Sequence, residues 1–152
     1  MHRHIFQKSL AAIAAGALAV TSLAVLPSFS ASAATTILSS DFSNGSSGWS
    51  TYKASGGSCS MGVENGKLAL TVNSVGTLNY SVQVGYDVVP LYQNGVYRLK
   101  YDISSTEDCT VEQMIQQNGG TYQSYTWKGL DLTAETQTVD YTFTMKQETD
   151  IM

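Results

Sequence analysis

Apolar and polar residues alternate with a period of two over most of this chain after residue 33. In the stretch VYRLKYDI (96–103), every second side chain is aromatic or aliphatic, and Arg98, Lys100 and Asp102 take the positions between them. Successive side chains of a strand point to opposite faces, so this alternation predicts strands with one buried face. Four more stretches share the pattern: KLALTV (67–72), YSVQVGY (80–86), TVEQMIQQ (110–117) and TVDYTFTM (138–145).

Short turn sequences separate these stretches, namely SNGSSG, ASGGS, ENG, QNG and QNGG. Asn-Gly and Gly-Gly pairs supply the positive φ angles that tight turns need. No stretch after residue 33 shows the period of an amphipathic helix. The sequence therefore predicts an all-β fold, an antiparallel β-sandwich, in a single domain over residues 34–152.

The first 33 residues have the pattern of a secretory signal peptide. A basic region (MHRHIFQK) precedes a run of apolar and small residues (10–26), and ASA at 31–33 offers small residues at the positions that a signal peptidase reads. A membrane anchor is the alternative, because the run is about as long as a short spanning helix. Pro27 and the ASA site favour cleavage after Ala33. We therefore expect residues 34–152 to be secreted, with no membrane association after cleavage.

Composition excludes several partners and mechanisms for residues 34–152. These residues hold six of the eight lysines and arginines and all twelve acidic residues, which gives a net charge of −6. Because basic residues do not cluster, nucleic acid and anionic membranes are not expected as partners. Both histidines precede residue 34, which excludes a Ser-His-Asp triad, a Cys-His pair and a histidine metal site. Cys59 and Cys109 either pair as a disulfide outside the cytoplasm or remain two separate thiols.

The chain ends in VDYTFTMKQETDIM, which reads as a strand, a turn and the first residues of another element. We therefore expect the chain to be a fragment of a longer protein.

Carboxylates are the candidates for catalysis that the composition leaves. Glycoside hydrolysis needs two carboxylates at a fixed separation, and a pair could come from Asp87, Glu107, Asp108 and Glu112. Glu107 and Asp108 are adjacent, so on a strand they would point to opposite faces. We favour surface or binding roles for all four and expect no catalytic residue in this chain.

The stretch MIQQNGGTYQSYTW (114–127) combines amides and aromatic rings without a charged side chain. On the strand predicted for 110–117, Glu112, Met114 and Gln116 share one face, opposite an apolar face. A carboxylate, a thioether and an amide make a poor core but a plausible binding face. Asn118 continues the same parity, and Tyr122 follows the Gly-Gly turn.

A sugar ring fits such a face. The apolar side of a pyranose can lie on an aromatic ring, while its hydroxyls pair with amides and carboxylates. Tyr52, in GWSTY, is the expected second ring, with Trp49 packed in the core. The alternative is that both Trp49 and Tyr52 are buried. The sequence does not decide whether Tyr125 and Trp127 contact the sugar.

The ordered blocks DFSNGSSGWSTY, ENGKLALTV, NYSVQVGYDVVPLYQNGVYRLKYDIS, CTVEQMIQQNGGTYQSYTW and VDYTFTM resemble carbohydrate-binding module families four and nine. These families include the cellulose-binding domains of bacterial endoglucanases, and the resemblance spans residues 37 to 145. It implies a jelly-roll sandwich whose concave sheet face binds a single β-glucan chain, from cellulose or a related plant polysaccharide. Tyrosines would flank the groove, and amides with a charged residue would line its floor.

Carried over by position, Tyr52 and Tyr122 match the flanking tyrosines, and Asn118 matches an asparagine of the floor. Glu112 stands where the family can have arginine and Met114 where it has an aliphatic residue, so the type of glucan stays open. Asp87 takes the place of another asparagine. The implied carbohydrate-binding set, with Gln116 added from strand parity, is Tyr52, Tyr122, Asn118, Glu112, Met114, Asp87 and Gln116.

The resemblance also bears on cofactors and partners. Family members often hold a structural calcium ion near the amino-terminal strand, which implies Asp41 and the carbonyl of Gly66 as ligands here, and binding requires no cofactor. Family members continue for one or two more strands than this chain does, so the resemblance implies a sandwich that is incomplete at its C-terminal strand or strands. Such a sheet would keep a vacant place, bordered by strand edges with unpaired backbone groups. We expect a non-catalytic module that binds β-1,4- or mixed-linkage glucan, attached to a downstream catalytic domain of a secreted glycoside hydrolase such as a cellulase. The alternatives are a part of the catalytic unit itself and a cell-surface adhesin or scaffold domain.

Overall fold

The computed structural model describes residues 11–15, 18–23 and 34–151. Within these residues the secondary structure is all β, and every pair of neighbouring strands is antiparallel. None of the described residues belongs to a helix long and apolar enough to cross a membrane. The strands are β1 (Ala11–Ala15), β2 (Leu18–Leu23), β3 (Thr35–Ser40), β4 (Trp49–Lys53), β5 (Gly57–Glu64), β6 (Lys67–Val75), β7 (Val82–Tyr86), β8 (Val96–Ser105), β9 (Cys109–Gln116), β10 (Ser124–Leu132) and β11 (Gln137–Thr144).

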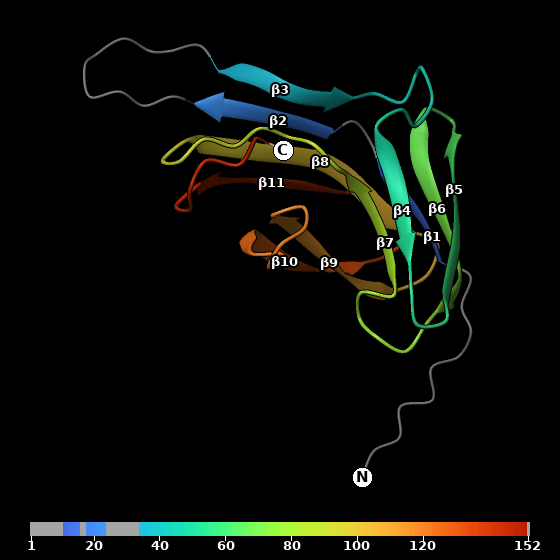
Figure 1. The fold of residues 1–152 in the computed structure, drawn as a ribbon. Helices are drawn as coiled ribbons and strands as arrows, with labels where there is room; N and C mark the ends of the chain where they lie inside the picture. Colours follow the sequence, from blue (N-terminus) through green and yellow to red (C-terminus); the bar gives the residue numbers. More distant parts are fainter. Residues whose placement is uncertain (1–10, 16–17, 24–33, 152) are drawn as a thin grey trace.

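Two layers can be followed in Figure 1. The first layer is a sheet in the order β3-β2-β8-β1-β6-β5. β2 and β1 pair with successive parts of β8, residues 96–100 and 103–105, and β11 also pairs with β8. The second layer consists of two strand pairs, β4–β7 and β9–β10. In Figure 1, β3, β2, β8 and β11 follow one another from the top, β9 and β10 lie below them, and β4 and β7 stand with β5 and β6 at the right-hand end. The predicted antiparallel β-sandwich is confirmed.

The main core lies between the first layer and β9–β10. The alternating residues of β8 that the sequence predicted to be buried are only 2–8% exposed. Among them, Leu99 and Tyr101 share one cluster with Leu130 and Leu132 of β10 and Val139 of β11. Complete burial of a leucine side chain stabilises the fold by about 1.5–3 kcal/mol, so this cluster is the main force that holds the layers together.

A smaller core lies at the other end of the sandwich. Cys59, Leu70 and Val72 of the β5–β6 hairpin are buried there, and Val82 and Val84 of β7 pack against them. This cluster places the β4–β7 pair over the β5–β6 hairpin.

The β5–β6 hairpin shows how the predicted turns work. Asn65 and Gly66 have φ angles of +51° and +71° and connect the paired residues Glu64 and Lys67. Positive φ at both central residues is the mark of a tight two-residue hairpin turn, for which Asn-Gly is the preferred sequence. The turn predicted from ENG is therefore present.

The cysteines are two free thiols. Cys59 belongs to the smaller core, whereas Cys109 packs against the main core and its Sγ lies 3.4 Å from the Oγ of Ser105. Of the two alternatives left open by the sequence, the structure shows separate thiols.

Two strands of the first layer come from residues 11–23, a segment that the sequence predicts to be removed as a signal peptide. In the chain before any cleavage, β1 pairs with β6 and β8, and β2 pairs with β3 and β8. The physical reason is that unpaired backbone groups at strand edges accept an extended segment, which satisfies hydrogen bonds that burial would otherwise leave unmade. Cleavage of a signal peptide after Ala33 stays a prediction, and it would remove both strands from the sheet.

A proline at Val20 tests the place of β2 in the sheet. Val20 is paired with Leu38 of β3 and with Leu99 of β8. Proline has no N–H and fits poorly between two neighbouring strands, so a carbonyl oxygen would lose its partner at a cost of about 1–3 kcal/mol. We expect Val20→Pro to lower the unfolding free energy of the intact chain in urea by about that amount.

The matched control is Ala34→Pro, because Ala34 is exposed and precedes the first residue of β3. Proline is tolerated at such a position, so this variant should unfold like the unaltered chain. If Val20→Pro unfolds at the same urea concentration as the control, β2 is not part of the sheet in solution.

Candidate functional site

An aromatic cluster fixes the start of β4. The Trp49 ring packs against Phe42 and Tyr86 with centroids 5.9 Å and 5.7 Å away, and its Nε1 donates a hydrogen bond to Ser40 Oγ at 3.1 Å. Gly48 is required beside it, because a Cβ there would lie 2.3 Å from the Tyr86 ring and the φ angle is +81°. Trp49 is therefore a structural residue, as the sequence predicted.

The anchored tryptophan determines which residues of β4 face outward. Ser50 and Tyr52 lie on the face of β4 opposite to that of Trp49, and the Tyr52 side chain is 54% exposed. Tyr52 lies opposite Gln83 of β7, and Ser50 Oγ donates to a carboxylate oxygen of Asp87 at 3.2 Å. Tyr52 and Asp87, both predicted site residues, thus share the outward face of the β4–β7 pair.

The β9–β10 pair presents a second outward face. Glu112 and Met114 are exposed and Gln116 is half-buried, while the intervening Val111 and Ile115 pack against the main core. This arrangement confirms the strand parity that the sequence predicted. The outward faces of both strand pairs therefore carry residues from the predicted site.

Asn118 joins the two faces. Its Nδ2 lies 3.5 Å from the backbone carbonyl oxygen of Asp87, a residue 31 positions earlier in the chain. The contact brings the end of β9 to the end of β7. We call the combined outward faces of β4–β7 and β9–β10, with the turn after Asn118, the second-layer surface.

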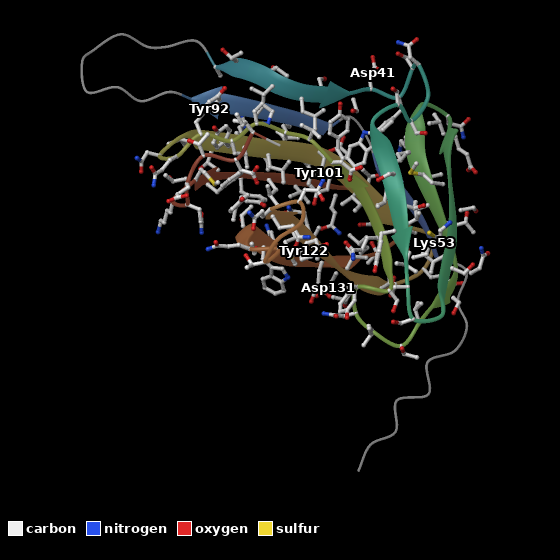
Figure 2. The ribbon with its side chains drawn as sticks, in the orientation of Figure 1. Asp41, Lys53, Tyr92, Tyr101, Tyr122 and Asp131 are labelled. Atoms are coloured by element: carbon white, nitrogen blue, oxygen red, sulfur yellow. The ribbon has the colours of Figure 1, made fainter. Side chains whose placement is uncertain are left out.

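Tyr122 projects from that turn and is 60% exposed (Figure 2). Gly119 and Gly120 have φ angles of +97° and +57°, and Tyr122 itself has a φ of +52°. A left-handed conformation costs a residue with a side chain roughly 1–2 kcal/mol, and such residues gather at ligand contacts. The strained backbone of this turn holds the ring of Tyr122 in an exposed position, four residues after Asn118.

Trp127 is an exposed residue of the same surface that the sequence left open. Its side chain is 56% exposed, and it lies opposite Met114 in the β9–β10 ladder. A β-bulge between Ser124 and Thr126 shifts the register, so a parity count forward from the turn fails. A count backward from the buried Leu132 would have placed Trp127 on the outward face.

Tyr125, the other aromatic residue left open, has a structural role. Its hydroxyl donates a hydrogen bond to Asp150 Oδ2 at 2.7 Å, which ties β10 to the last described residues. Desolvation by burial, followed by the hydrogen bond and the charge of Asp150, raises the pKa of Tyr125 to about 12. The side chain is half-buried and already has its partner.

The carboxylates named as candidates for catalysis come from the end of β7, the connection between β8 and β9, and β9 itself. Glu107 and Asp108 are both exposed in the connection between β8 and β9, and Asp87 accepts its hydrogen bonds from Ser50. A surface hollow of about 290 Å³, lined in part by Asp108 and Asp131, lies at the end of β9–β10 far from Tyr122. None of the residues that line this hollow belongs to the predicted carbohydrate-binding set.

The carboxylates with shifted pKa values lie away from this surface. The hydrogen bond and charge of Arg98 lower the pKa of Asp140 on the outer face of β8–β11. Backbone and side-chain hydrogen bonds from Ser43 lower the pKa of Asp41. Both carboxylates are structural or surface groups, because their partners come from this chain.

The predicted calcium ligands supply too few oxygens on their own. Calcium takes about six to eight oxygen ligands. Asp41 is exposed after β3, and one of its oxygens already accepts the N–H and hydroxyl of Ser43 at 3.0 Å and 2.8 Å. Among the residues the structure describes, no group of three or more His, Cys, Asp or Glu could hold a metal. Backbone carbonyls and water would have to supply the remaining oxygens, and calcium binding at Asp41 and the carbonyl of Gly66 stays a prediction.

Comparison with known proteins identifies the family. The family model of the carbohydrate binding domain of modules four and nine matches residues 34–151. A cellulose 1,4-β-cellobiosidase of Acetivibrio thermocellus is 34% identical over an alignment of 113 residues, and the match covers 67% of this chain and 13% of that protein. Endoglucanase C of Cellulomonas fimi is 32% identical over 126 residues, which are 83% of this chain and 11% of that protein.

A solved structure described as "CBM4 structure and function" superposes with a TM-score of 0.61 at 24% sequence identity, covering 69% of this chain and 71% of that one. That likeness supports the fold. The chain spans only 13% and 11% of the lengths of the two enzymes that it resembles in sequence. From the match of the family model over residues 34–151, we conclude that this chain belongs to the carbohydrate binding domain family.

Proposed function

We propose that the second-layer surface binds a single β-glucan chain, of β-1,4 or mixed linkage. The observation that carries the proposal is the pair of exposed tyrosines, Tyr52 and Tyr122, on strand pairs that the contact of Asn118 with Asp87 brings together. Rings offer flat apolar faces for sugars, and amide and carboxylate groups pair with hydroxyls. The names of the two enzymes similar in sequence, a cellobiosidase and an endoglucanase, point to the same class of polymer.

Each contact to the glucan is individually weak. Covering one sugar face with a tyrosine ring removes roughly 50–100 Å² of apolar surface from water, which stabilises the complex by about 1–2 kcal/mol. A hydrogen bond adds only about 1 kcal/mol, because bonds to water are exchanged for it. After the cost of association, two rings and a few hydrogen bonds give a dissociation constant in the high-micromolar range.

Weak binding of this kind is suited to a module that tethers an attached enzyme to its polymer substrate. We propose that the chain is the amino-terminal part of a secreted glycoside hydrolase of the cellulase type, with a catalytic domain downstream. Holding that domain near an insoluble polymer raises its effective concentration, even when the affinity of the module is modest. The small share of each enzyme that this chain covers fits a module within a larger protein.

Alanine at Tyr52 or Tyr122 tests the binding surface. Each substitution removes one platform, so each should weaken binding to soluble mixed-linkage glucan about tenfold, as measured by affinity electrophoresis. Tyr52→Phe and Tyr122→Phe keep the rings and should bind nearly as well as the unaltered chain. Since both side chains are more than half exposed, neither alanine variant should unfold.

Tyr92→Ala is the matched control, because Tyr92 is also 60% exposed but lies in the loop before β8 (Figure 2). Its mobility in the glucan gel should equal that of the unaltered chain. Equal mobility of the Tyr52 and Tyr122 alanine variants as well would reject the proposed surface.

A second measurement separates binding from catalysis. Purified chain incubated with soluble glucan should release no more reducing sugar than a buffer blank, because we expect Asp87, Glu107, Asp108 and Glu112 to have surface or binding roles and not the paired roles that glycoside hydrolysis needs. Sustained release that disappears in Glu112→Gln or Asp87→Asn would instead make this chain part of a catalytic unit. Binding that free oligosaccharides fail to compete would favour an adhesin or scaffold role.

A further inference from the structure

Trp127 lies exposed on the second-layer surface although it has no structural task there. Its side chain is 56% exposed, and none of the ring contacts within the described residues includes it. Its Nε1 makes no hydrogen bond to a described residue, whereas the Nε1 of Trp49 is bonded to Ser40. An indole of this kind has a bare apolar face and an unused donor.

The neighbours of Trp127 leave its ring accessible along the sheet. Gly129 is the next residue on the same face, and a Cβ at that position would lie 3.7 Å from Cη2 of the indole. The indole therefore extends over Gly129, which has no side chain that would push the ring away from the sheet. Across the ladder stands Met114, which is 41% exposed and contributes a polarisable thioether.

The place of Trp127 differs from that of the two tyrosines. Tyr52 belongs to β4 and Tyr122 to the turn after Asn118, whereas Trp127 lies within β10, on the pair of strands that also carries Glu112 and Met114. The same outward face continues from Gln116, which is opposite Ser124, to Glu112, which is opposite Gly129. A ligand that leaves Asn118 along β9 would meet the indole next.

We propose that Trp127, Met114 and Gly129 form a separate sugar subsite, which stacks one further pyranose ring of the same glucan chain and donates the indole N–H to a hydroxyl. This subsite rests on the proposed function, because it extends a glucan already held at Tyr52 and Tyr122. Its consequence is selectivity for length: a chain long enough to reach from the tyrosines to Trp127 binds more tightly than a short one.

The test uses the full chain and β-1,4-linked gluco-oligosaccharides of increasing length, titrated by calorimetry. In the unaltered chain, affinity should rise in a step of about tenfold when the ligand becomes long enough to cover the indole. Trp127→Ala should abolish that step and leave the affinity for the shortest binding ligand unchanged. Trp127→Phe keeps a smaller ring and should keep part of the step, whereas Tyr52→Ala should weaken binding at every length.

Tryptophan fluorescence supplies a second readout that needs no variant. The chain has two tryptophans, and Trp49 is half-buried in its aromatic cluster. Acrylamide should quench the exposed Trp127 strongly in the free chain and weakly once a long oligosaccharide is bound. A short oligosaccharide should leave the quenching unchanged, because it does not reach the indole.

The outcomes separate the two proposals. If long oligosaccharides bind and require Tyr52, but Trp127→Ala retains the length step and the ligand gives no protection from acrylamide, the subsite is overturned and the proposed function stands. If the unaltered chain binds no glucan of any length, the proposed function fails and the subsite fails with it.

Discussion

The packing of β8 against the β9–β10 pair is the constraint on which the binding surface depends. Leu99 of β8 shares the main core with Leu130 and Leu132 of β10. Because side chains alternate along a strand, burial of the two leucines directs Trp127 and its neighbours outward. A slip of one residue in this register would bury the indole and expose the leucines. The core therefore orients the face that we propose to bind glucan.

An open face with weak contacts matches a polymer rather than a small ligand. Tyr52, Tyr122 and Trp127 are each more than half exposed, and none lies in the hollow at the far end of β9–β10. A repeating ligand can occupy several such platforms at once, so modest individual contacts add along one chain.

Much of this arrangement could be predicted from the sequence, because burial of one strand face leaves a local pattern. The exposure of Met114 followed from parity alone. The face of Trp127 did not, because the bulge after Ser124 breaks the count. The meeting of Asn118 with Asp87 depends on how two strand pairs dock, which alternation does not encode, and only the family resemblance suggested it. The pairing of β1 and β2 could not be predicted, because their segment has the composition of a signal peptide and its apolar run also suits a strand; cleavage after Ala33 stays a prediction.

A nuclear magnetic resonance titration of the labelled chain with a soluble gluco-oligosaccharide tests the central claim most directly. The account predicts that amide shifts concentrate on outward residues of β4, β9 and the turn that carries Tyr122, with Tyr52, Gln116 and Asn118 among the largest. The outer face of β8–β11, marked by the ion pair of Arg98 and Asp140, should stay unchanged. Shifts centred on that outer face, or spread evenly over the domain, would contradict a glucan site on the second layer.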